Sequence, residues 1–176
     1  ISRKDYLPKE LLECVLYFYK NKTELKDVED KEKEYLILKG MLNAIFGMMV
    51  TDPVKPIIEF DGKDFNVNFS NIQECLDAYN TRYDKFLVYE WGIYCTAYAR
   101  RNLFTGVKEL KEDYIYADTD SLKYTNFNKH KKYFDTYNAI VLNKIEKVCK
   151  KYKFDINVFS PKDIYGVTHT IGLYDY

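Results

Sequence analysis

The stretch Tyr114–Tyr124, YIYADTDSLKY, decides the fold of this chain. Both of its ends are rich in aromatic and branched residues, which favour β-strands. Asp118, Thr119 and Asp120 lie between those ends and are typical of a tight turn. The stretch therefore predicts two short strands that flank a compact acidic turn, with two carboxylates only two residues apart.

Apolar residues at helical spacing predict helices on both sides of this hairpin. Helices are expected over about residues 8–22, 91–104 and 129–151, and the spacing of Leu38, Leu42, Ile45 and Met49 predicts one more between the first two of these. A polar stretch from Lys22 to Asp30 joins the first two helices along the chain, so they form a helical hairpin. Pro53 ends the second helix, because proline disfavours helical geometry in the residue before it. Gly106 is typical of the end of the third helix.

The remaining segments predict further strands. Apolar and polar residues alternate from Ile57 to Phe69, which indicates a β-hairpin with Asp61-Gly62 at its tip. Residues 156–173 alternate similarly and predict two or three short strands, whereas residues 71–90 have no clear pattern. The fold class is therefore α+β. His130 and His169 are expected to be a surface residue and a strand residue, and neither is expected to bind a metal.

The composition is that of a soluble chain that forms a hydrophobic core. Its 176 residues are enough for one compact domain or two small lobes, and 47% are hydrophobic. The absence of any apolar run near 18 residues excludes a membrane span. Lys and Arg number 27, equal to Asp and Glu, which excludes a strongly basic histone-like binder. Because residue 1 is isoleucine, we expect the sequence to begin inside a longer protein.

Asp118 and Asp120 are the first candidates for chemistry. Two carboxylates pushed together at a turn repel one another unless a cation compensates their charge. Mg²⁺ suits such a turn, because it binds one or two carboxylates and completes its coordination with water and substrate phosphates. The alternative is an ordinary hairpin turn, in which aspartates are common.

The second predicted helix carries a candidate phosphate site. Lys39, Asn43 and Phe46 lie at i, i+4 and i+7, so an ammonium, an amide and a ring share one face. Lys22 and Lys26 add positive charge near the end of the first helix. Such a face can hold a triphosphate and stack a base. The alternative is the solvated side of an ordinary helical hairpin, with Phe46 in the core.

Four motifs, in this order, resemble those of family B DNA polymerases. Lys22–Lys26 falls where that family has a basic pair on its first fingers helix, and Lys39–Gly47, KGMLNAIFG, is similar to its fingers motif. Thr96–Arg100, TAYAR, resembles a template- and primer-contacting motif of the protein-primed phage and organellar-plasmid branch. Tyr116–Ser121, YADTDS, resembles the metal-binding palm motif. The resemblance extends from about Leu7 to Tyr176.

The resemblance implies a DNA-directed DNA polymerase. In such enzymes the primer 3′-hydroxyl attacks the α-phosphate of a dNTP, and two Mg²⁺ ions stabilise the attacking and leaving oxygens. Asp118 and Asp120 would be the catalytic metal ligands. The implied nucleotide-binding residues are Lys39, Asn43, Phe46, Lys22 and Lys26. The implied DNA-binding residues are Thr96, Arg100, Tyr116 and Thr119. Three positions depart from the usual motifs, with Ala44, Phe46 and Lys22 where the family has Ser, Tyr and Arg.

The same resemblance implies the domains, partners and location. Residues 1–50 would be a fingers helical hairpin. Residues 51–176 would be a partial palm of antiparallel strands packed with helices, with an inserted β-hairpin near 55–90, where protein-primed members carry a DNA-encircling insertion. The implied partners are a DNA primer–template and a dNTP, with either a nucleic acid or a terminal protein as the primer, and no membrane. The location would be the host cytoplasm of a phage or plasmid.

One element of the family pattern is missing from these residues. The Asp-x-x-Ser-Leu-Tyr motif, which supplies the partner aspartate for two-metal catalysis, does not occur in the sequence. We therefore expect the isolated chain to be inactive and its Mg²⁺ site to be completed by an aspartate outside this chain. Two alternatives stay open. One is a non-catalytic nucleic-acid-binding or interaction module derived from a polymerase palm, and the other is a reverse transcriptase or RNA-dependent polymerase.

Overall fold

The computed structural model describes residues 6–82 and 88–175 and has the predicted α+β class. The chain forms two compact units, each described here by itself. Unit 1 combines Ile1–Ile45 with Tyr98–Tyr176, and unit 2 is Phe46–Ala97.

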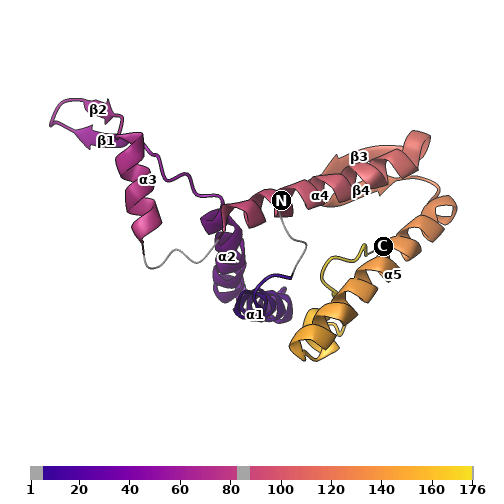
Figure 1. The fold of residues 1–176 in the computed structure, drawn as a ribbon. Coiled ribbons are helices and arrows are strands. Elements are labelled where there is room, and N and C mark those ends of the chain that lie inside the picture. The colour runs from indigo at the N-terminus through magenta and orange to yellow at the C-terminus, as the bar shows by residue number, and fades with distance from the viewer. Residues whose placement is uncertain (1–5, 83–87, 176) are drawn as a thin grey trace. The chain divides into compact units, whose positions relative to one another are not determined.

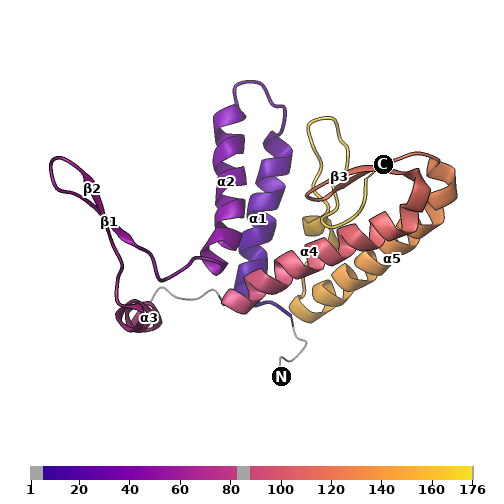
Figure 2. The same ribbon diagram turned by 90° about the horizontal axis from the view of Figure 1, so that it is seen from above.

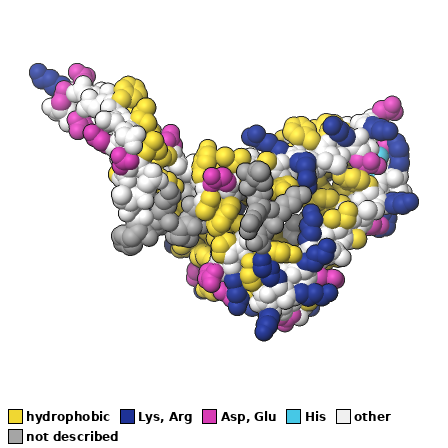
Figure 3. Space-filling view, in the orientation of Figure 1, with side chains coloured by type: hydrophobic (Ala, Val, Ile, Leu, Met, Phe, Trp, Pro, Cys, Tyr) yellow, Lys and Arg dark blue, Asp and Glu magenta, His cyan; other side chains and the backbone are white. Residues whose placement is uncertain are grey.

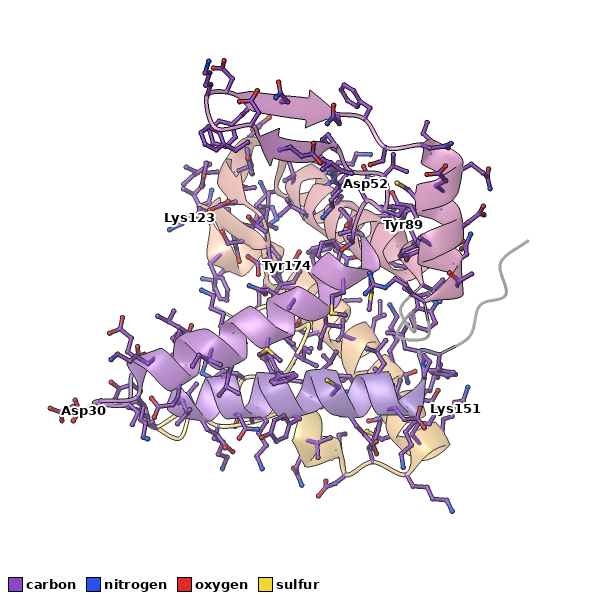
Figure 4. All side chains as sticks on the ribbon, turned by 90° about the vertical axis from the view of Figure 1, so that its left-hand side faces the viewer. Asp30, Asp52, Tyr89, Lys123, Lys151 and Tyr174 are labelled. Carbon is purple, nitrogen blue, oxygen red and sulfur yellow. The ribbon has the colours of Figure 1, made fainter. Side chains whose placement is uncertain are left out.

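The predicted helical hairpin is present, and all but the end of its second helix belongs to unit 1. It consists of α1 (Lys9–Leu25) and α2 (Glu32–Met49), which lie side by side with Asp30 in the connecting loop (Figures 2 and 4). α1 continues beyond residue 22, where the periodicity predicts its end, to Leu25. In its last turns Thr23 is buried, and the Thr23 hydroxyl donates to the Tyr19 carbonyl oxygen at 2.8 Å.

The acidic hairpin is also confirmed. β3 (Tyr114–Asp118) and β4 (Ser121–Tyr124) are antiparallel and lie along the C-terminal half of α4 (Tyr89–Leu110), as Figure 1 shows. The prediction that Gly106 ends this helix is wrong, since Gly106 lies inside α4. Glycine occupies this buried position for a different reason. A Cβ there would approach Leu122 Cδ1 to 2.5 Å, so glycine allows β4 to pack closely.

The core of unit 1 joins segments that are far apart in the sequence. α5 (Phe127–Tyr152) follows the hairpin, and the short 3₁₀ helices η1 (Lys111–Asp113) and η2 (Ile156–Phe159) lie before β3 and after α5. A buried cluster packs α1, α5 and η2 together. Its members are Leu16, Ile145, Cys149 and Phe159.

The strands predicted near the C-terminus are wrong. Within the described residues of that segment, the strand pairing is one isolated bridge between Lys162 and Thr168. The reason is local, because the Asp163 carboxylate accepts from the backbone N–H groups of Tyr165 and Val167, each at 2.9 Å. These bonds close a turn and compete with a strand ladder.

Unit 2 contains the second predicted hairpin. β1 (Ile57–Phe60) pairs antiparallel with β2 (Phe65–Asn68), and Asp61–Asp64 connects them. α3 (Ile72–Thr81) follows, in a segment for which the sequence predicted no element. Asn71 begins it as an N-cap, accepting from the Gln73 N–H at 2.9 Å.

The β1–β2 hairpin of unit 2 is apolar and exposed on one face. Ile58 lies opposite Val67 and Phe60 opposite Phe65, so these four side chains share a face of the ribbon. Each is at least half exposed, and Figure 3 shows apolar side chains along this element.

In the described parts of both units, every helix is too short or too polar to cross a lipid bilayer.

Candidate functional site

The β3–β4 hairpin of unit 1 has one packed face and one open face. The cross-strand pair Ala117–Leu122 is half-buried and faces α4. The neighbouring pairs, Tyr116–Lys123 and Asp118–Ser121, point to the opposite face and are exposed. Figure 4 shows Lys123 at the outer edge of the hairpin. The alternation of the strands therefore presents the Asp118 carboxylate and the Tyr116 ring to solvent.

Thr119 holds the turn in a strained conformation. Its φ is 49°, in the left-handed region that a β-branched residue rarely adopts. Its hydroxyl donates to Asp118 Oδ1 at 3.0 Å, which fixes the orientation of that carboxylate. Backbone strain of this kind costs about 1–3 kcal/mol and is concentrated at functional sites.

We expect Thr119→Gly to stabilise unit 1 while loosening the site. Glycine adopts positive φ freely, so the free energy of unfolding should rise by about 1 kcal/mol after its entropic cost. The Asp118 carboxylate should lose its fixed orientation with the hydroxyl. Urea unfolding and Mn²⁺-induced broadening of the Ser121 amide signal measure the two effects. Thr105→Gly, at an exposed helical position of α4, is the control and should destabilise.

Asp120 lines a small cavity beside the acidic turn. The cavity has a volume of about 180 Å³. It is lined by Asp120, Ser121, Leu122, Tyr124, Phe134, Leu173, Tyr174 and Asp175. Aromatic and aliphatic side chains from β4, α5 and the C-terminal segment therefore share this cavity with two carboxylates.

The helical hairpin brings Lys22 into the electrostatic range of this carboxylate. Burial lowers the pKa of Lys22, and the ammonium groups of Lys39 and Lys26 lower it further. The Asp120 carboxylate acts in the opposite direction and raises the same pKa. All four residues belong to unit 1. The structure therefore joins, around Lys22, the basic residues predicted on two helices and the acidic residue predicted on the turn.

The other predicted residues are divided between the units. In unit 1, Asn43 is exposed on α2 and Arg100 is exposed on α4. Unit 2 holds Phe46, which is 39% exposed, so the core alternative for this ring is wrong. Thr96 is half-buried in unit 2, and its hydroxyl donates to the Gly92 carbonyl oxygen at 3.1 Å. That bond occupies the hydroxyl hydrogen, which leaves only the acceptor lone pairs for another molecule.

Sequence reasoning missed a buried polar network at the base of the hairpin. His130, expected at the surface, is only 3% exposed, and its Nε2 lies 2.8 Å from Asp113 Oδ2. Lys129 Nζ and Asn126 Nδ2 donate to the same carboxylate, each at 2.6 Å. The missed signal was the spacing, since Asn126 immediately precedes α5 and Lys129 and His130 lie on its first turn.

Asp118 and Asp120 are the donors available for a metal ion. Carboxylate oxygens are hard ligands that suit Mg²⁺, and the exposed turn leaves room for water and phosphate oxygens. Over residues 6–82 and 88–175 there is no group of three or more His, Cys, Asp or Glu side chains placed to hold a metal. The donor set therefore fits an ion that takes most of its ligands from elsewhere.

Comparison of the chain with protein-family models, with curated proteins and with solved structures gives no match in any of the three.

Proposed function

We propose that this chain is the fingers and partial palm segment of a DNA-directed DNA polymerase similar to family B. It would bind a dNTP between the helical hairpin and the acidic turn of unit 1. The reaction would be template-directed nucleotidyl transfer to a primer 3′-hydroxyl. An aspartate outside this chain would complete the two-metal site, so the 176-residue chain would bind substrates without extending a primer.

The observation that carries the proposal is the convergence around Lys22. Three ammonium groups near one another repel, and here one is also partly buried. Such an arrangement lowers stability unless an anion compensates it. A triphosphate is the anion that fits, because it carries several charges and the nearby Asp120 carboxylate can bind the divalent cation that usually accompanies it.

Each residue has a distinct role in this reaction. Lys22, Lys26 and Lys39 would hold the β- and γ-phosphates and offset charge on the departing pyrophosphate. Asn43 would line the nucleotide pocket from α2. Asp118 and Asp120 would hold Mg²⁺, which supplies charge neutralisation at the reacting phosphate when it is bound.

The distribution of charge supports nucleic-acid binding by unit 1. The net charge of zero conceals an asymmetry, since unit 2 has eight acidic and four basic residues, whereas unit 1 has 19 acidic and 23 basic residues. In Figure 3, Lys and Arg side chains are frequent over unit 1. Exposed Tyr116, Thr119 and Arg100 of unit 1 are the proposed DNA contacts of this unit. Backbone contacts of this kind position a duplex without reading its sequence.

Nucleotide binding to the 176-residue chain tests the proposal. We expect Mg²⁺·dATP to bind, and Lys22→Gln to weaken binding about tenfold, the effect of losing one charge-assisted hydrogen bond. Phosphate binds the protonated ammonium. Since the pKa of Lys22 is lowered in the free protein, affinity should fall as pH rises through that value. Lys22→Gln should remove this step from the pH profile.

Isothermal titration calorimetry over a pH series gives both quantities. The control is Lys144→Gln, which removes an exposed lysine of α5 and should leave affinity unchanged. Equal weakening by the two variants would mean that only overall charge matters, and a chain that binds no dATP would refute the proposal.

A second candidate is a nucleic-acid-binding module that has lost catalysis. It is favoured by one observation, the lack of a third metal ligand among the described residues. Salt-dependent DNA binding without any response to Mg²⁺ or dATP would support this candidate.

A further inference from the structure

The base of the β3–β4 hairpin carries a buried histidine with one unused nitrogen. His130 Nδ1 is the buried side-chain nitrogen or oxygen atom that lacks a hydrogen-bond partner over residues 6–82 and 88–175. It faces Glu109 Oε1 of α4 at 3.9 Å, too far for a hydrogen bond. A buried polar atom without a partner is unfavourable, so this nitrogen requires an explanation.

The tautomer of His130 follows from its other nitrogen. Lys129, His130 and Asn126 donate to the Asp113 carboxylate and hold its pKa well below the usual range. Asp113 is therefore ionised throughout the pH range in which imidazoles titrate, and an ionised carboxylate only accepts hydrogen bonds. Nε2 must carry the hydrogen in its 2.8 Å contact with Asp113. Nδ1 is left with a lone pair that points towards the carboxylate of Glu109.

Protonation of His130 changes the contact between Nδ1 and Glu109 from repulsive to attractive. A proton taken from solvent converts Nδ1 from an acceptor into a donor, and a lone pair facing a carboxylate becomes an N–H facing a carboxylate. The 3.9 Å separation from Glu109 can then close to a charge-assisted hydrogen bond. Glu109 has the freedom for this movement, because its side chain is 45% exposed.

The network is attached to both strands of the acidic hairpin. Asp113 immediately precedes β3, and its carbonyl oxygen accepts from the Thr125 N–H, which follows β4, at 2.9 Å. The His130 ring also packs edge-on against Tyr124 of β4, with centroids 6.0 Å apart. Movement of His130 therefore acts on the start of β3 and the end of β4, the two strands that flank the acidic turn.

We propose that His130, between Asp113 and Glu109, is a pH-responsive latch that positions the β3–β4 hairpin. Protonation closes the contact to α4 and fixes the base of the hairpin, and deprotonation opens it. The ionisable groups around the ring come from α4, η1, β4 and α5. They are Glu109, Asp113, Tyr124, Lys129 and Tyr133. The effect on Asp118 and Asp120 as metal ligands rests on the proposed function, whereas the latch itself does not.

NMR of the ¹⁵N-labelled 176-residue chain tests the latch. Only two histidines occur in the sequence, so His169→Gln leaves His130 as the sole imidazole to be assigned. We expect the Nε2–H tautomer in the neutral ring, and the Thr125 and Tyr114 amide signals should shift when His130 is protonated. Glu109→Gln should reduce those amide shifts by at least about half, because a neutral amide attracts the imidazolium less.

The controls separate the latch from general effects of charge. Glu146→Gln removes an exposed carboxylate elsewhere on α5 and should leave the amide shifts unchanged. An Nδ1–H tautomer, or amide shifts that Glu109→Gln leaves at full size, would overturn the proposal. A chain that binds neither Mn²⁺ nor dATP but keeps the amide response would refute only the proposed function.

Discussion

Replacing Asp120 by asparagine should change dATP binding in opposite directions with and without a divalent ion. With Mn²⁺ present, the affinity should fall at least about tenfold, because the amide lacks the charge that a hard cation requires. Without metal, the affinity should rise about two- to threefold, since removal of a nearby negative charge reduces repulsion of the triphosphate. Calorimetry with dATP, with Mn²⁺ and with EDTA, measures both.

The cavity supplies a matched control for this substitution. Asp175 lines the same hollow as Asp120 but lies outside the acidic turn. Asp175→Asn removes an equal charge and should preserve the enhancement of binding by Mn²⁺. If both variants lost that enhancement equally, Asp120 would act through the negative charge that it adds to the cavity and not as a ligand of the metal ion. In a longer polypeptide with the partner aspartate, Asp120→Asn should also abolish primer extension.

The elements that the sequence predicted are those with a strong local period. The helical hairpin and both β-hairpins follow from apolar spacing and from turn residues, and these are properties of neighbours in the chain. The predictions for Gly106 and for the C-terminal strands were wrong for the opposite reason. Glycine is required at position 106 because Leu122 packs closely there. The C-terminal segment is held by hydrogen bonds that the Asp163 carboxylate accepts from the backbone.

The candidate site divides in the same way. Asp118 and Asp120 were visible as a pair in the sequence, and the periodicity placed Lys39 on a helix. The proximity of Lys22 to Asp120 depends on the packing of α1 in unit 1, which periodicity does not determine. The Asp113–His130 pair was missed because its members are 17 positions apart and meet only when α5 packs against η1.

Phe134→Ala should be the most destabilising single change in unit 1. Phe134 is 1% exposed and lies stacked on Tyr124, with centroids 5.2 Å apart, and edge-on to Tyr174 at 5.0 Å. Truncation of a buried phenylalanine removes its transfer free energy and leaves a cavity, a loss of about 3–5 kcal/mol. Domains of this size are stable by only about 5–15 kcal/mol. The urea midpoint, followed by tyrosine near-UV circular dichroism, should fall accordingly.

Phe134→Ala should also disturb the proposed nucleotide site, because Phe134 and Asp120 line the same cavity. Phe134→Leu keeps most of the volume and should lose less than about 1.5 kcal/mol. Phe104→Ala is the matched control: this α4 phenylalanine is 61% exposed, and its truncation should change stability by less than about 0.5 kcal/mol. Equal losses for Phe134→Ala and Phe104→Ala would mean that the aromatic cluster does not form the core that supports the acidic hairpin.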